Sequence, residues 1–206
     1  MKRFITAMLV LVMVLSVTAC AAKDPLIGTW RGTMDISQMY SEQLQGSGME
    51  DYMDLKDISF DMIMTFGEDQ SIKMEADKAS VEAMADKLVD IMVGATIQLL
   101  ESQNATLADM GVDEETLRES VAQSINAETL LGSFDFESSN GYYLYEDGKL
   151  YRADSVEELE EAKAEGSEYI SIELKSGEFS LIDIVDGEDK FSDMAGNMLP
   201  ITMKKQ

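Results

Sequence analysis

The sequence predicts an antiparallel up-and-down β-barrel of the mainly β (α+β) class, interrupted by helical insertions. Several segments alternate apolar and polar residues and are joined by short turn sequences, which is typical of strands with one buried face. Two longer stretches between these segments carry apolar residues at helical spacing instead. Strands in sequential hairpins close most simply into a barrel, because closure leaves no exposed edge.

The N-terminal segment has the pattern of an export signal. Met1, Lys2 and Arg3 form a cationic start, and the apolar run over residues 4–17 is too short for a comfortable membrane span. Val17-Thr18-Ala19-Cys20 resembles the lipobox of bacterial lipoproteins, in which the cysteine is lipidated and begins the mature chain. This resemblance implies a signal peptide over residues 1–19, a lipid on Cys20, and a short tether over residues 20–26 at the extracytoplasmic face of the cell membrane. The alternative is a signal that merely ends near this cysteine, or a free buried thiol.

Composition narrows the possible functions. The chain carries 40 acidic and 16 basic residues, a net charge of −24, which repels nucleic acid and favours cations, basic peptides or simple solubility. It contains no histidine, which excludes Ser-His catalysis and imidazole zinc sites, and no carboxylate pair stands out as an acid/base dyad. We therefore expect no enzyme, metal or cofactor. The acidic stretch 183–189 lacks the EF-hand ligand order, so a solvated loop is favoured over a loose calcium site.

The first strand covers residues 27–36 and contains the single tryptophan. Alternation places Trp30, Gly32, Met34 and Ile36 on one face and polar residues on the other. Residues 37–55 then form a first insertion, with a short helix, a Gly-Ser-Gly break and another helical turn.

Alternation returns over residues 58–66, passes a turn at residues 67–70 and continues through the return strand 71–76. The second insertion, residues 77–131, predicts a helical hairpin. Its first helix has apolar residues at Val81, Met84, Leu88, Met92, Ala95 and Leu99. Its second helix follows Asp113, an N-cap residue, and continues toward Gly132.

Further strands are predicted in the remaining chain, which brings the number of predicted strands to nine. The first of these segments contains Phe134 and Phe136, and the others lie near residues 143–145, 150–152, 170–174, 179–185 and 199–203. A capping box that begins at Ser155 predicts a short helix that ends at Gly166. Methionine is frequent, with 16 residues, and is expected mainly to fill core gaps, the alternative being an adaptable binding surface. Packing explains the tyrosines at 142, 143, 145 and 151 more readily than ligand stacking does.

Gly28-Thr29-Trp30 on the first strand, followed by a meander of hairpins, resembles the lipocalin-like (calycin) proteins, especially small acidic lipoproteins of unknown function from Gram-positive bacteria. The resemblance implies one barrel domain over residues 27–206, with Trp30 in its closed end and Lys204 or Lys205 over the ring. The chain departs from the family pattern in the helical insertion and at Gln70, where a hairpin turn of this kind would favour glycine. The family ligand is therefore not carried over.

Two functions follow as expectations. The first is a membrane-anchored binding module for a small apolar or amphipathic ligand. The alternative is an envelope protein-protein interaction or inhibitor lipoprotein with a filled barrel. Counting strand directions places both insertions on one rim, opposite the lipid, where loops of a rigid scaffold often bind. Candidate contacts there are Met39, Leu44, Met84 and Leu88, and helices that only plug the barrel are an equal alternative.

Overall fold

The protein forms a closed antiparallel β-barrel of eight strands. The computed structural model describes residues 24–206, except 47, 135, 137–139, 167 and 186–197, so the predicted signal peptide and Cys20 lie outside the described residues. The strands are β1 (Gly28–Asp35), β2 (Ser59–Phe66), β3 (Ser71–Ala76), β4 (Gly141–Glu146), β5 (Lys149–Ala153), β6 (Tyr169–Lys175), β7 (Glu178–Val185) and β8 (Ile201–Lys205). Each strand pairs with the next, and β1 pairs with β8 to close the barrel. The predicted fold class is confirmed.

The helices lie in the connections that follow alternate strands. Helix α2 (Ser37–Leu44) and the 3-10 turn η1 (Glu50–Tyr52) separate β1 from β2, and α6 (Val156–Glu165) separates β5 from β6. Between β3 and β4 lie α3 (Lys78–Ser102), η2 (Ala108–Met110), α4 (Glu114–Ser124) and α5 (Ala127–Phe134).

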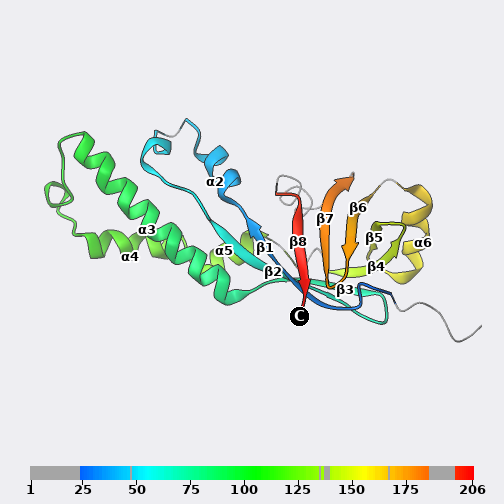
Figure 1. Ribbon diagram of the computed structural model, residues 1–206. Helices are drawn as coiled ribbons and strands as arrows, with labels where there is room; N and C mark the ends of the chain where they lie inside the picture. Colours follow the sequence, from blue (N-terminus) through cyan, green and yellow to red (C-terminus); the bar gives the residue numbers. More distant parts are fainter. Residues whose placement is uncertain (1–23, 47, 135, 137–139, 167, 186–197) are drawn as a thin grey trace, which may run out of the picture.

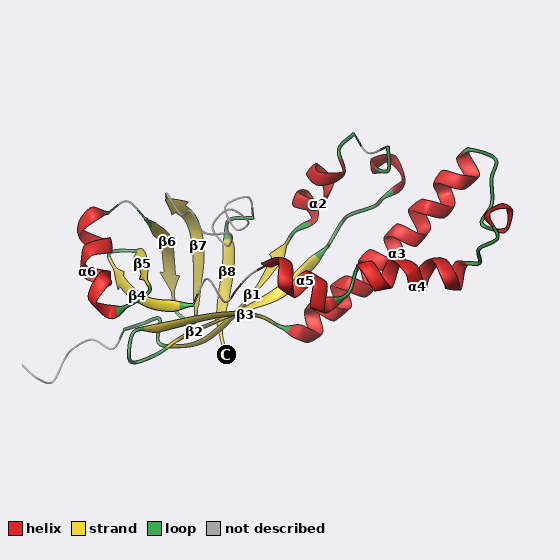
Figure 2. Ribbon diagram, turned by 180° about the vertical axis from the view of Figure 1, so that it is seen from behind, coloured by secondary structure: helices red, strands yellow, loops and turns green. Residues whose placement is uncertain are grey.

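Because neighbouring strands run in opposite directions, all of these helical connections fall at one end of the barrel, which we call the helical rim. Figures 1 and 2 show α2 and the α3–α4 pair extending from this end. The opposite end, the turn rim, carries the short turns at residues 67–70, 147–148 and 176–177. The prediction that both large insertions share one rim is confirmed.

Trp30 closes the turn rim from within. Its side chain is 2% exposed, its Nε1 donates to the Leu26 carbonyl oxygen at 2.6 Å, and its ring meets Phe179 edge to face at 4.9 Å between centroids. Lys205 Nζ lies 5.1 Å from the Trp30 ring centroid and also donates to the Ile27 carbonyl at 2.9 Å. The predicted packing of Trp30 under a lysine of the last strand is confirmed.

Large apolar side chains fill the barrel interior. Phe66 makes edge-to-face contacts with Tyr143 and Phe179, at 4.9 and 5.9 Å between centroids. Methionines fill much of the remaining core, as expected from their flexible and unbranched chains. Those buried in the core are Met34, Met62, Met64, Met74, Met84 and Met203.

The helical insertion packs on the barrel through the first half of α3 and through α5. Val81 and Leu88 of α3 belong to the same core cluster as the barrel strands, and so does Phe134, whose ring stacks on Phe60 at 4.7 Å. The prediction of a strand at Phe134 and Phe136 is wrong, because Phe134 ends helix α5. Leu130, one helical turn before Phe134, is also buried, so burial in this segment follows the helical period.

Two further predictions need correction. The second helix of the insertion is not continuous: Asn126 interrupts it and caps α5 by accepting from the Thr129 backbone N at 3.0 Å. Helix α6 lies where the capping box predicted and ends at Gly166 in the left-handed conformation (φ 63°), but the Ser155 side chain makes no capping hydrogen bond. Asp113 does cap α4, by accepting from Thr116 N at 2.8 Å.

Candidate functional site: the mouth of the barrel

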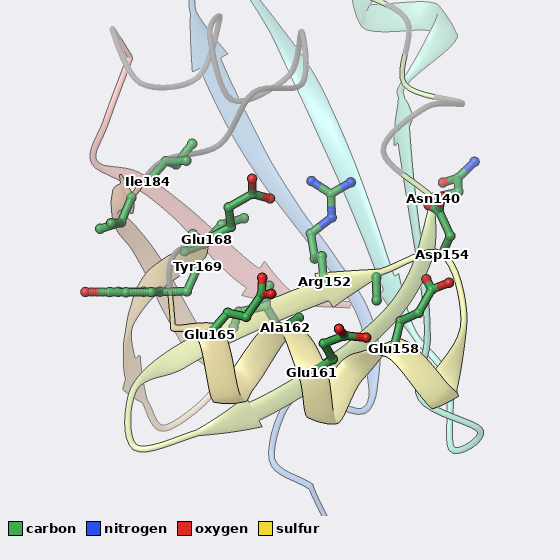
Figure 3. Close-up of a pocket in the computed structure, with 14 residues that line it drawn as sticks. Asn140, Arg152, Asp154, Glu158, Glu161, Ala162, Glu165, Glu168, Tyr169 and Ile184 are labelled. Atoms are coloured by element: carbon green, nitrogen blue, oxygen red, sulfur yellow. The ribbon is translucent and has the colours of Figure 1, made fainter.

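A cavity of about 430 Å³ opens at the helical rim, between β5, β6, β7 and α6 (Figure 3). It exists because β5 and β6 pair only at Lys149–Ser171 and Leu150–Ile170. Beyond Leu150 the two strands separate, and α6 connects their diverging ends. We call this cavity the mouth. The residues that line it are Asn140, Leu150, Arg152, Ala153, Asp154, Glu158, Glu161, Ala162, Glu165, Glu168, Tyr169, Ile170, Ile184 and Val185.

The base of the mouth is apolar and continuous with the barrel core. Leu150 and Ile170 are 0% and 3% exposed, and both belong to the core cluster. Ile184 is half-buried and packs against that cluster from β7. Because Leu150 and Ile170 are almost fully covered, the apolar surface that an entering group could contact here is that of the partly exposed Ile184 and Val185.

Carboxylates surround the mouth above this base. Glu158, Glu161 and Glu165 all line it, and their spacing of three and four residues places them on one face of α6. Asp154 precedes the helix and Glu168 follows it, so five carboxylates line the cavity. Figure 3 shows the three helical glutamates along the side of α6 that borders the cavity.

The orientation of α6 is set on its other side. Lys163 forms an ion pair with Glu146 of β4 at 2.5 Å, and the hydrogen bond from this lysine to the carboxylate raises the pKa of Lys163. Leu159 is buried at 2% exposure. Apolar packing and an ion pair thus hold the helix against β4 and β5, and the glutamate face remains toward the mouth.

Arg152 is the one cationic residue among the described residues that line the mouth. It lies two residues after Leu150 on β5, so its side chain leaves the strand on the same inward face. Figure 3 shows its guanidinium group rising from β5, with Glu168 on one side and Asp154 and Asn140 on the other. The mouth therefore combines an apolar base, an acidic wall and a single guanidinium.

The contacts predicted from the sequence lie elsewhere. Met39 and Leu44 on α2 are half-buried and pack against the core. Met84 and Leu88 on α3 are 3% and 2% exposed and belong to the core itself. None of the four lines the mouth, and Gly28 and Trp30 lie at the turn rim.

The predicted tyrosine cluster is divided between the two faces of the sheet. Tyr143 is in the core, whereas Tyr151 packs against Tyr169 with centroids 5.9 Å apart. The acidic face of α6 and the inward register of Arg152 were visible in the sequence. What connects them is the separation of β5 from β6, which no sequence signal indicated.

The described part of the chain contains neither a metal-binding cluster nor a membrane-spanning helix. No group of three or more cysteine, aspartate or glutamate side chains there is arranged to hold a metal ion. Within that same part, no helix has both the length and the apolar character that crossing a membrane requires. Of the possible calcium loop at 183–189, residues 186–189 lie outside the described residues.

Comparison with family models, with curated proteins and with solved structures found no match to this chain.

Proposed function

We propose that this chain is a lipid-anchored extracytoplasmic binding protein whose lipocalin-like barrel holds an apolar or amphipathic small molecule in its mouth. The observation that carries the proposal is the cavity itself, which has an apolar base and polar walls at the open end of a barrel whose other end is sealed by Trp30. Small-molecule sites typically combine an apolar lining with a few polar groups, often in the mouth of a β-barrel.

The resemblance to lipocalin-like proteins supports this proposal. The Gly28-Thr29-Trp30 motif lies at the start of the first strand, and Lys205 of the last strand lies over the Trp30 ring. The strands also follow one another around the barrel in sequence order.

The start of the described chain supports the proposed orientation at the membrane. The Asp24 carboxylate accepts from the Leu26 backbone N at 2.9 Å and from the Tyr143 hydroxyl, which ties the chain to the turn rim. Asp24 lies four positions after Cys20 in the sequence, a reach of at most about 14 Å. A lipid on Cys20 would hold the turn rim near the membrane and the mouth away from it.

The Cys20→Ser variant tests the anchor. We expect it to move from the membrane fraction to the soluble fraction, because the serine cannot carry the thioether-linked lipid. Trp30 fluorescence of the released protein should remain that of a buried indole, which controls for unfolding. Retention of the variant in the membrane fraction contradicts lipidation at Cys20.

Native mass spectrometry of the purified chain tests the binding function. We expect a small molecule to co-purify and its occupancy to fall in Ala162→Phe, because a phenyl group at this lining position occupies the mouth. Ala164→Phe is the matched control, since Ala164 is exposed on the same helix and does not line the cavity. A chain that carries no small molecule, together with equal behaviour of the two variants toward added amphiphiles, contradicts the proposal.

A second function is favoured by the arm that α3 and α4 form beyond the barrel (Figures 1 and 2). Met110, in the turn between these helices, is 63% exposed. An exposed methionine on a projecting arm suits an envelope protein-protein interaction or inhibitor lipoprotein. A photo-crosslinking residue at position 110 should then capture one saturable partner on intact cells. The same residue at position 156, also exposed but on α6, is the control, and equal capture at both positions counts against this function.

A further inference from the structure

The far end of the arm that α3 and α4 form carries a groove of about 280 Å³. It lies between the C-terminal part of α3, the turn η2 and the start of α4, and we call it the tip groove. Three of its apolar side chains, Ile97, Leu100 and Leu107, are only half-buried, so the groove presents apolar surface to solvent. The residues that line it are Ile97, Leu100, Glu101, Ala105, Thr106, Leu107, Ala108 and Glu114.

The tip groove has no part in the packing of the barrel. Leu88 is the last residue of α3 in the buried core cluster, and η2 and α4 contain no buried residue. None of residues 92–124, all of which the structure describes, belongs to that cluster or packs against it. Figures 1 and 2 show this part of the arm standing away from the barrel. Apolar side chains that stay partly exposed on such a projection mark an interaction surface.

Hydrogen bonds within the tip hold it in a defined shape. The Asp109 carboxylate accepts from the Thr106 backbone N at 2.9 Å and from the Thr106 hydroxyl at 2.7 Å. Gly111 adopts the left-handed conformation, with φ 72°, and ends η2 before the chain turns into α4. Met110, which is 63% exposed, therefore projects from an ordered turn, two residues after Ala108 of the groove lining. A surface that is ordered before binding loses less conformational entropy when a partner binds.

The charge of the tip selects among possible partners. Residues 97–119 contain six carboxylates and one basic residue, Arg118, which already pairs with Asp90 of α3. Two of the carboxylates, those of Glu101 and Glu114, line the groove itself. A second copy of this chain, or an anionic membrane surface, would bring like charges together at the tip. A basic segment of another protein would meet complementary charge.

The size of the groove favours a single side chain over a separate small molecule. Sites for small organic molecules usually measure about 300–1,000 Å³, and the tip groove is below this range. We infer that the tip groove docks a basic segment of a partner protein, which inserts one large apolar side chain between flanking lysine or arginine residues. Such inserted anchors supply most of the binding energy in many interfaces. This inference rests on the protein-protein interaction proposed above as the second function, and it specifies the chemistry of the partner.

NMR titration of the isotope-labelled full chain with short blocked peptides tests the partner class. The probes are Gly-Lys-Lys-Phe-Lys-Lys-Gly, the same peptide with alanine in place of phenylalanine, and the same peptide with glutamate in place of every lysine. We expect the first peptide to shift the amide signals of the groove residues and to bind about tenfold more tightly than the alanine peptide. The glutamate peptide should not bind. Equal affinity of the first two peptides contradicts the apolar anchor, and binding of the glutamate peptide contradicts the basic class.

A pair of charge variants assigns the electrostatic part to the groove. In E101Q/E114Q the affinity for the phenylalanine peptide should fall about three- to tenfold, because two partly exposed charge pairs are lost. E115Q/E119Q is the matched control, since it removes the same charge from α4 without changing the groove lining. An equal loss in both variants would mean that the general field of the protein attracts the peptide, which overturns the inference.

A second pair of variants assigns the apolar part. Ala108→Phe places a ring at the groove and should remove the advantage of the phenylalanine peptide over the alanine peptide. Ser120→Phe, at an exposed position of α4 outside the groove lining, should leave that advantage unchanged. Circular dichroism checks that both variants keep the helices. The same loss in Ser120→Phe would place the anchor elsewhere and contradict the inference.

The photo-crosslinking residue at position 110 separates the inference from its premise. We expect the captured partner to be joined through a segment with lysine or arginine around an apolar side chain, as mapped by mass spectrometry. An acidic or uncharged segment would overturn the partner class, while the interaction function survives. Capture of a second copy, or binding of the chain without its lipid to phosphatidylglycerol vesicles through the tip, would also overturn it. If nothing is captured at position 110, the interaction function fails and the inference fails with it.

Discussion

The guanidinium group of Arg31, on β1, donates at 2.7 Å to the carboxylate of Asp77, the residue that caps α3. Asp77 Oδ1 in turn accepts from Ser80 N at 3.0 Å, and a second Arg31 nitrogen bonds Asp61 of β2 at 3.2 Å. Arg31 thus joins two barrel strands to the first turn of the long helix. This contact sets the direction in which the insertion leaves the barrel.

Replacing the capping carboxylate should loosen the insertion. Asp77→Ala removes both the cap and the pairing with Arg31, whereas Asp77→Asn keeps a capping oxygen, so we expect thermal stability to decrease in the order wild type, Asn, Ala. Asp113→Ala removes the cap of α4, a helix with no buried residue, and should change the melting temperature less. Circular dichroism melts of the four proteins measure this order. A larger effect at Asp113 than at Asp77 contradicts it.

The contribution of Asp77 should also depend on pH. The hydrogen bond from Ser80 N, with the charge of Arg31, holds the pKa of Asp77 below its usual value of 3.8. A carboxyl group whose pKa is depressed by folding stabilises the folded state above the unfolded-state pKa, and loses this effect as the pH falls through the folded-state pKa. The melting difference between wild type and Asp77→Ala should therefore be constant near neutrality and shrink below about pH 4. A difference that grows in acid refutes the assignment.

Two glycines should respond to alanine in opposite directions. At Gly32 a Cβ would clash with Met203 Sδ and lie 2.7 Å from the Thr202 carbonyl oxygen, where β1 meets β8, so Gly32→Ala should cost about 1–3 kcal/mol. Gly94 lies inside α3 and a Cβ there meets nothing within 4 Å, so Gly94→Ala should stabilise by about 0.5–1 kcal/mol. Denaturant unfolding measures both. A Gly32→Ala variant as stable as the wild type would contradict the close contact between β1 and β8, and a destabilising Gly94→Ala would contradict the open space beside Gly94.

Substitutions of Trp30 measure how much the packing at the turn rim contributes to the stability of the barrel. Trp30→Ala should cost about 3–5 kcal/mol, because it removes a large buried ring and leaves a cavity. Trp30→Phe keeps an aromatic ring against Phe179 but leaves the Leu26 carbonyl without its Nε1 donor, so its cost should be smaller. As the single tryptophan, this residue also reports its own environment. An emission maximum typical of indole in water contradicts the burial.

Sequence patterns predicted the elements well where burial follows a simple period. Residues 59–66 alternate buried and half-buried positions along β2, and α3 buries Val81, Met84 and Leu88 at helical spacing. The pattern gave a wrong prediction at Phe134. Phe134 and Phe136 are two residues apart, which fits a strand, and only the apolar Leu130, one helical turn before Phe134, indicates the helix. Short segments carry too little periodicity to decide such cases.

The mouth could not be predicted from sequence patterns, for a different reason. Arg152 and Glu161 belong to different elements, and each alone reads as a solvated charge. They line one cavity because β5 and β6 stop pairing after Leu150 and Ile170, a register property set by the whole barrel. The candidate contacts Met84 and Leu88 belong to an apolar stripe along α3, and this stripe is what buries both residues in the core.

Tyr143 should make the protein sensitive to alkali. The phenol is 1% exposed and donates to the Asp24 carboxylate, so burial first, and then this hydrogen bond and the charge of Asp24, raise the pKa of Tyr143 well above its usual value of 10.0. In the unfolded chain the phenol ionises near pH 10, while in the folded protein it stays protonated. The unfolded state therefore binds fewer protons above that pH, and stability that is fully present below pH 10 declines as the pH rises.

Tyr143→Phe removes this titrating group, so the melting temperature of the variant should fall less steeply between pH 9 and 11 than that of the wild type. At pH 7 the variant should melt at a lower temperature than the wild type, because it lacks the hydrogen bond to Asp24. Tyr142→Phe, at the neighbouring position on β4, measures how far the loss of any tyrosine hydroxyl on this strand alters the curve. Absorbance of phenolate at high pH provides an independent check, because the folded wild type and Tyr143→Phe should ionise the same number of tyrosines near pH 11. One additional ionising group in the wild type at that pH would show that Tyr143 is open to solvent and that Asp24 does not hold the N-terminal segment against the barrel.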